Sequence, residues 1–110
     1  MKKLRVILLG AILTSISPVS FGSLYDCMQA GLDIKTNYQK AILYCKPYEK
    51  NISASNILGS AYYFSHEYKL SKKYIYNFIS YSKFNDVDQL TLASAYGILG
   101  NIYYNWSYAL

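Results

Sequence analysis

The amino-acid sequence predicts an all-α protein built as a stack of antiparallel helical hairpins, with about five helices. Apolar residues recur at helical spacing along most of the chain, whereas the alternation typical of strands is weak. A ten-residue pattern that begins at Ala54 returns at Ala95, with six of the ten positions identical and an offset of 41 residues. Similarity at a fixed period is typical of repeat proteins, which bury a continuous core by stacking helical units.

The first 22 residues have the pattern of an export signal. Lys2, Lys3 and Arg5 precede an apolar run over 6–16, and small residues at positions −3 and −1 place the cleavage site after Gly22. A membrane-spanning helix needs about 20 apolar residues, so this run is too short for a transmembrane anchor. We therefore expect a signal peptide over 1–22, a single domain over 23–110, a periplasmic or secreted location and no stable membrane insertion after cleavage.

The positive charge gives no support for nucleic-acid binding. The net charge is +5 for the whole chain, and three of its eleven basic residues lie in the leader. A nucleic-acid-binding surface needs a clustered basic face. Lys69, Lys72 and Lys73 do cluster, but their helical spacing is more typical of a solvated helix face.

The first two predicted helices form a hairpin. The helix over 24–34 carries a short apolar set: Leu24, Cys27, Met28 and Leu32. The second helix begins at Thr36, which with Gln39 has the spacing of a capping box. Its apolar stripe is Tyr38, Ala41, Ile42, Cys45 and Tyr48. Pro47 lacks an amide hydrogen and should kink or end this helix near Cys45.

Three further helices are predicted. The third starts after Ser53, a favourable N-cap, and the fourth covers 69–81. The fifth runs to about residue 106, with Asn85, Asp86 and Asp88 as candidate caps. Gly59 and Gly100 occupy the same register of the repeated pattern, inside helices where glycine costs about 1 kcal/mol relative to alanine. Their recurrence predicts a close approach by a neighbouring helix at both positions.

The repeated unit resembles the tetratricopeptide repeat and its Sel-like relatives. The resemblance rests on Leu58-Gly59 followed by Tyr62, then Tyr68 and the small Ser71, with Leu99-Gly100 and Tyr103 as a second first helix. The 41-residue spacing is longer than the tetratricopeptide unit of about 34 residues and suits Sel-like repeats better, whose Gly-x-Gly turn is missing here. The resemblance implies an α-solenoid in which the first helices line a concave face.

That family implies a non-enzymatic module that binds a protein or peptide. Its concave face would carry five polar and aromatic residues: Asn56, Ser60, Tyr63, Asn101 and Tyr104. The apolar stripe of the last helix, which includes Trp106, predicts either a bound partner or self-association there. Two alternatives stay open: a small periplasmic hydrolase of the cysteine-rich Sel-like type, and a truncated or decayed repeat protein.

Cys27 and Cys45 are the most testable pair. Each lies nine residues from a turn centred near Thr36, so an antiparallel hairpin would bring them to similar heights. An exported protein favours a disulfide over two buried thiols. The pair lacks the C-x-x-C spacing of redox and metal sites, and the chain has one histidine, so we expect no catalytic residue, cofactor or metal. That histidine, His66, falls in a turn beside Glu67 and is better explained as a helix-end residue than as a general base.

Tyrosine is unusually frequent, at 14 of 110 residues. Tyr62 and Tyr103 occupy the packing position of the repeated pattern and are expected in the core. The surplus tyrosines are Tyr63, Tyr76, Tyr81, Tyr104 and Tyr108. They indicate either an interaction surface or compositional drift.

Overall fold

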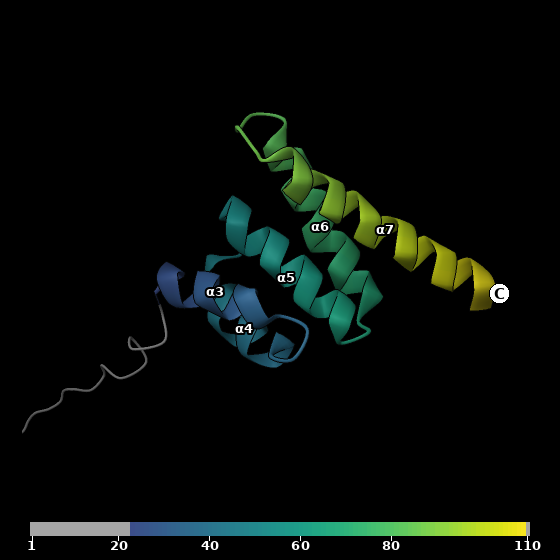
Figure 1. Ribbon diagram of the computed structural model, residues 1–110, viewed down its shortest axis with the longest axis horizontal. Helices are drawn as coiled ribbons and strands as arrows, with labels where there is room; N and C mark the ends of the chain where they lie inside the picture. Colours follow the sequence, from purple (N-terminus) through teal and green to yellow (C-terminus); the bar gives the residue numbers. More distant parts are fainter. Residues whose placement is uncertain (1–22, 110) are drawn as a thin grey trace, which may run out of the picture.

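The computed structural model describes residues 23–109, with side chains up to residue 105. All regular secondary structure in this part of the chain is helical (Figure 1). Five α-helices follow one another without an intervening strand in this range: α3 (Leu24–Ala30), α4 (Tyr38–Cys45), α5 (Ile52–Phe64), α6 (Tyr68–Ser82) and α7 (Gln89–Ala109). The predicted all-α class is confirmed. The predicted signal peptide lies outside the described residues. No helix within them is long and apolar enough to cross a membrane.

The α3–α4 hairpin forms much as predicted, with one error at its turn. Helix α3 is capped by Ser23 and continues into a short 3-10 turn, η1 (Gly31–Asp33). Helix α4 ends at Cys45, where Pro47 forces a second 3-10 turn, η2 (Lys46–Tyr48). The predicted capping box at Thr36 is wrong. Asn37 is the N-cap residue, and the Thr36 hydroxyl instead donates to the carbonyl of Asp33 at 3.3 Å.

Two apolar residues of the helix predicted over 24–34 are more exposed than their spacing predicted. Met28 is 40 % exposed and Leu32 is 75 % exposed. The chain leaves the α-helical path at Gly31, so Leu32 lies in η1 and no longer follows the buried stripe of α3. Cys27 and Ala30 are the residues of α3 that the core buries.

Helix α5 begins two residues earlier than predicted. Asn51 has an extended backbone, and its side-chain oxygen accepts from the amides of Ser53 at 2.9 Å and Ala54 at 3.1 Å. Ser53 therefore lies inside the first turn and is not the cap. Asparagine is as good an N-cap as serine, so residue preference alone could not separate the two.

Helices α5 and α6 pack closely through small residues. The hydroxyl of Ser71 on α6 donates to the carbonyl of Gly59 at 2.7 Å, and that of Ser55 on α5 donates to the carbonyl of Tyr74 at 2.9 Å. Both serines are fully buried. A Cβ atom at Gly59 would come within 2.4 Å of Cδ1 of Ile75. The close approach predicted for Gly59 is confirmed.

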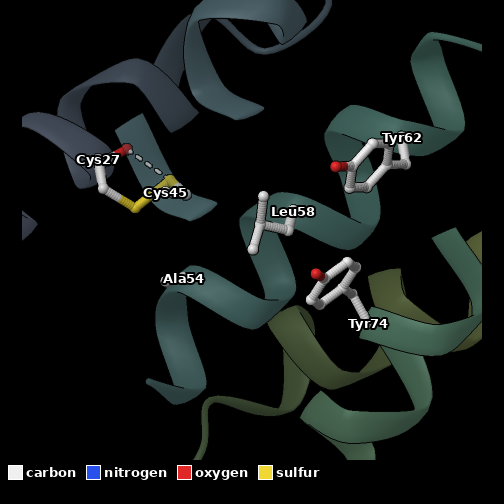
Figure 2. Packing of buried hydrophobic residues seen from close by; sticks show 6 residues of the cluster. All are labelled: Cys27, Cys45, Ala54, Leu58, Tyr62 and Tyr74. Atoms are coloured by element: carbon white, nitrogen blue, oxygen red, sulfur yellow. Dashed lines mark hydrogen bonds between the residues drawn. A yellow bond between two sulfur atoms is a disulfide. The ribbon is translucent and has the colours of Figure 1, made fainter. Parts of the chain in front are cut away.

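The main core lies between the first hairpin and this pair. Figure 2 shows Leu58 between the Cys27–Cys45 disulfide on one side and the facing rings of Tyr62 and Tyr74 on the other. The two rings stack with centroids 5.7 Å apart and an interplanar angle of 12°. Leu58 and both cysteines are fully buried. The first hairpin and the α5–α6 pair therefore share one core.

Helix α7 packs on this assembly by one face. Asp88 caps it, accepting from the amide and the hydroxyl of Thr91 at 3.0 and 3.1 Å. The residues of α7 that the core buries recur at helical spacing: Ala95, Leu99 and Ile102. Two predictions for this helix are wrong. No described atom comes within 4 Å of a Cβ built at Gly100, and Tyr103 is 43 % exposed, with its hydroxyl 2.7 Å from that of Tyr76 on α6.

Candidate functional site

The described residues form an open groove between α3, α5 and α7, with a volume of about 470 Å³. We call it the α3–α5–α7 groove. Its lining comes from all three helices, from the end of α6 and from the loop between α6 and α7: Met28, Ile52, Ser53, Asn56, Ile57, Phe78, Asn85, Asp86, Val87, Asp88 and Thr91. The volume is within the range of sites that bind small molecules or peptide side chains.

The lining combines apolar side chains with carboxylates, amides and hydroxyls. Phe78 is 2 % exposed and belongs to the core shared by α6 and α7, which Ile52 and Val87 also contact. Met28 projects from α3 with 40 % of its surface exposed, which the groove explains. Thioether side chains adapt to ligands of varied shape, so Met28 is suited to a binding surface.

Acidic and amide side chains come from the segment between α6 and α7. Asp88 is held by its bonds to Thr91, and Asn85 donates from its amide nitrogen to the carbonyl of Tyr81 at 2.7 Å. Asp86 is exposed and has no hydrogen-bond partner among the described side chains. The lining contains two carboxylates and no Lys or Arg. The local potential therefore favours a cationic group on a ligand.

The disulfide fixes one side of this groove. Cys27 and Cys45 are bonded with their Cα atoms 4.7 Å apart, so the predicted bridge is confirmed. It joins α3 to the end of α4, and Met28 is the next residue on α3. Both cysteines are fully buried and neither is a thiol in this structure, so neither is a nucleophile. The bridge acts on the groove by holding α3 in place.

His66 lies in the turn between α5 and α6, as predicted. Its backbone has a φ of 65°, and Nδ1 is 3.0 Å from the hydroxyl of Tyr68. The left-handed conformation lets the chain reverse between the two helices, a task that glycine more often performs. Among the described residues, no group of three His, Cys, Asp or Glu side chains is arranged to hold a metal ion.

The residues predicted to bind a partner do not come together. Asn56 lines the groove, and Ser60 is half-buried, donating to the carbonyl of Asn56 at 3.1 Å within α5. Tyr63 is half-buried, with its ring 5.9 Å from that of Tyr68. Two residues are exposed on α7 away from the groove: Asn101 and Tyr104. The side chain of Trp106 lies outside the described residues.

The sequence pattern missed most of the groove. Met28 and Val87 were apolar residues with no assigned site, and Asp86 and Asp88 were interpreted only as caps. The sequence did contain an indication of the groove, because Asp86 and Asp88 lie in one short segment between two helices. Carboxylates in such a segment can cap the following helix and also give a negative charge to the adjacent surface. The chain matches no known protein family, no curated protein and no solved structure.

Proposed function

We propose that this chain is an exported, non-catalytic module of the tetratricopeptide or Sel-like type, which binds a segment of another protein in the α3–α5–α7 groove. The observation that supports it most is the lining of the groove: apolar side chains from several helices beside Asp86 and Asp88, with no cation among them. Specific binding sites combine an apolar surface with a few polar groups that fix orientation.

The lining defines the chemistry of the partner segment. An aliphatic or aromatic side chain would contact Met28, Ile57 and Val87. A lysine or arginine next to it in the segment would reach Asp86, whose carboxylate has no competing partner among the described side chains. The amide of Asn56 can donate to and accept from the backbone of the bound segment.

Selection of peptides from a random library displayed on phage tests this proposal. We expect selected peptides to share an apolar residue flanked by Lys or Arg. Asp86→Lys should weaken their binding by about three- to tenfold, since an exposed charge pair contributes up to about 1 kcal/mol and reversal adds repulsion. Met28→Glu should weaken it further by placing a charge on the apolar surface.

A matched control comes from Asp33→Lys. Asp33 is exposed in η1 and does not line the groove, and this variant has the same change in charge as Asp86→Lys. Equal losses for the two variants would indicate long-range electrostatics without a site. Peptides that lack basic residues, or that bind Met28→Glu as well as wild type, would refute the assignment of the groove.

The Cys27–Cys45 disulfide supports the proposed export, because disulfide bonds persist in oxidising compartments outside the cytosol. The intact mass of the protein recovered from the periplasm or medium should correspond to a chain that begins at Ser23. A chain that retains Met1 in the membrane fraction would contradict cleavage after Gly22.

A further inference from the structure

Met28 carries the only thioether of the chain after the leader. The sequence contains two methionines, Met1 and Met28, so residues 23–110 have one. Met28 lines the α3–α5–α7 groove and has 40 % of its surface exposed. Methionine is among the residues most often buried in proteins, whereas water and small solutes in the open groove can reach this one.

The disulfide holds Met28 at the groove. Its neighbour Cys27 is fully buried and bonded to Cys45 at the end of α4 (Figure 2). Helix α3 therefore cannot turn about its axis without breaking the bridge or pulling it out of the core. Met28 itself does not belong to the core clusters of the described residues. A chemical change of its side chain would therefore alter the groove and leave the packing of the core intact.

The other sulfur atoms of the described residues are protected from oxidants. A two-electron oxidant such as hydrogen peroxide attacks exposed thiolates and thioethers. Both cysteines are joined in the bridge, and their side chains are fully buried. Within the part of the chain that the structure describes, the thioether of Met28 is therefore the sulfur that a peroxide would modify.

We propose that Met28 is an oxidation site that regulates the α3–α5–α7 groove: a peroxide converts its thioether to the sulfoxide, and this weakens binding of the partner segment. The inference rests on the proposed function of the groove. In the reaction, the O–O bond of the peroxide breaks and one oxygen atom passes to the sulfur of Met28. The sulfur is oxidised by two electrons, the peroxide is reduced to water or an alcohol, and no bond within the chain breaks.

The sulfoxide changes the apolar part of the lining. Met28 lines the groove together with Ile57 and Val87, whose side chains offer no hydrogen-bond donor. The oxygen of a sulfoxide is an acceptor, and in the open groove it binds water. An apolar side chain of the partner would displace this water without replacing its hydrogen bonds, which costs affinity. Oxidised Met28 therefore opposes the contact that the reduced side chain favours.

Oxidation of this kind is reversible. Methionine sulfoxide has two epimers, and a separate class of reductase returns each of them to the thioether. Because the reaction leaves the backbone and the core unchanged, reduction would restore the original lining of the groove. The two kinds of sulfur beside the groove then have different tasks. The buried Cys27–Cys45 bridge is a fixed support, whereas Met28 controls whether an apolar side chain is accepted.

Treatment with dilute hydrogen peroxide tests the proposal, with protein purified from cells that express the full chain. The intact mass should increase by one oxygen atom, peptide mapping should place that atom on Met28, and the helical circular dichroism should not change. The binding probe is the tightest peptide from the phage selection. Its dissociation constant should rise about three- to thirtyfold on oxidation, because a polar group would replace an apolar one at the contact. Methionine sulfoxide reductases for both epimers should restore the original affinity.

Two variants locate the effect at Met28. Met28→Leu has no sulfur, so its affinity for the peptide should be the same before and after peroxide treatment. Addition of Leu32→Met to this variant moves the thioether to η1, where Leu32 is 75 % exposed and does not line the groove. Oxidation of the double variant should also leave its affinity for the peptide unchanged.

The possible failures are distinguishable. Binding that survives complete oxidation of Met28 would overturn this inference and leave the proposed function standing. The same holds if Met28 resists a peroxide concentration that oxidises the double variant, or if oxidation weakens binding equally in the double variant. A selection that yields no peptide specific for the groove would refute the proposed function, and this inference with it.

Discussion

Gly59 is the position at which substitution tests the packing of α5 on α6 most directly. A Cβ atom there would lie 2.4 Å from Cδ1 and 2.6 Å from Cγ1 of Ile75. Ile75 is fully buried, and its backbone nitrogen would lie 3.2 Å from the same Cβ. Because Ile75 is buried and its backbone also lies close, Gly59→Ala requires Ile75 or the two helices to shift.

The size of the effect follows from two opposing contributions. Overpacking a core contact costs about 1–3 kcal/mol, whereas alanine in place of glycine recovers about 1 kcal/mol of helix propensity. We expect Gly59→Ala to lower the free energy of unfolding by up to about 2 kcal/mol, and the melting temperature by up to roughly 15 °C. Gly100→Ala meets no described atom and should raise the stability by up to about 1 kcal/mol.

Urea unfolding followed by circular dichroism measures both variants. A double-mutant cycle sharpens the test, because Ile75→Val removes the Cδ1 atom that the new methyl group would strike. Alone, this change should cost about 0.5–1.5 kcal/mol, and in the Gly59→Ala background it should cost less or stabilise. Equal effects of alanine at both glycines, or strictly additive effects in the cycle, would refute the described contact.

Three further changes test other features. Cys45→Ser should lower the free energy of unfolding by about 2–4 kcal/mol, because the bridge closes an 18-residue separation. Chemical denaturation measures this difference, and an unchanged free energy of unfolding would contradict the prediction. Glu49 accepts a 2.5 Å hydrogen bond from the Tyr74 hydroxyl, and this bond lowers the pKa of the Glu49 carboxyl. The bond to ionised Glu49 therefore stabilises the fold fully above the ordinary pKa of a glutamate, and that contribution is lost as the pH falls through the lowered pKa. Tyr74→Phe should therefore lose less stability than wild type between pH 7 and pH 3, and an equal loss would contradict the linkage. Asp88→Ala removes the cap of α7 and should cost about 0.5–2 kcal/mol, with the loss visible as a lower urea midpoint.

The arrangement of helices could be predicted because it depends on local patterns. Pro47 ends α4 at Cys45 through a steric effect that needs no tertiary information. The disulfide followed from the symmetry of a hairpin about its turn. Helix starts were less predictable, since Asn51 and Ser53 are equally suitable caps and only the backbone conformation decides between them.

The site was harder to predict because its residues come from distant parts of the sequence. Met28 and Asp86 are separated by 58 positions and meet only when α3, α5 and α7 are stacked. The two repeat glycines show the same limit. Gly59 and Gly100 occur in nearly identical sequences, but one lies against Ile75 and the other has no described neighbour within 4 Å. A short pattern specifies the face of a helix and not what covers it.

The paired serine bonds between α5 and α6 have a consequence for the order of folding. Their partners are only 12 and 19 residues apart in sequence, so the entropy lost in closing these contacts is small. Contacts of low sequence separation form early in folding transition states. We expect α5 and α6 to form the folding nucleus, on which α7 and the first hairpin dock later.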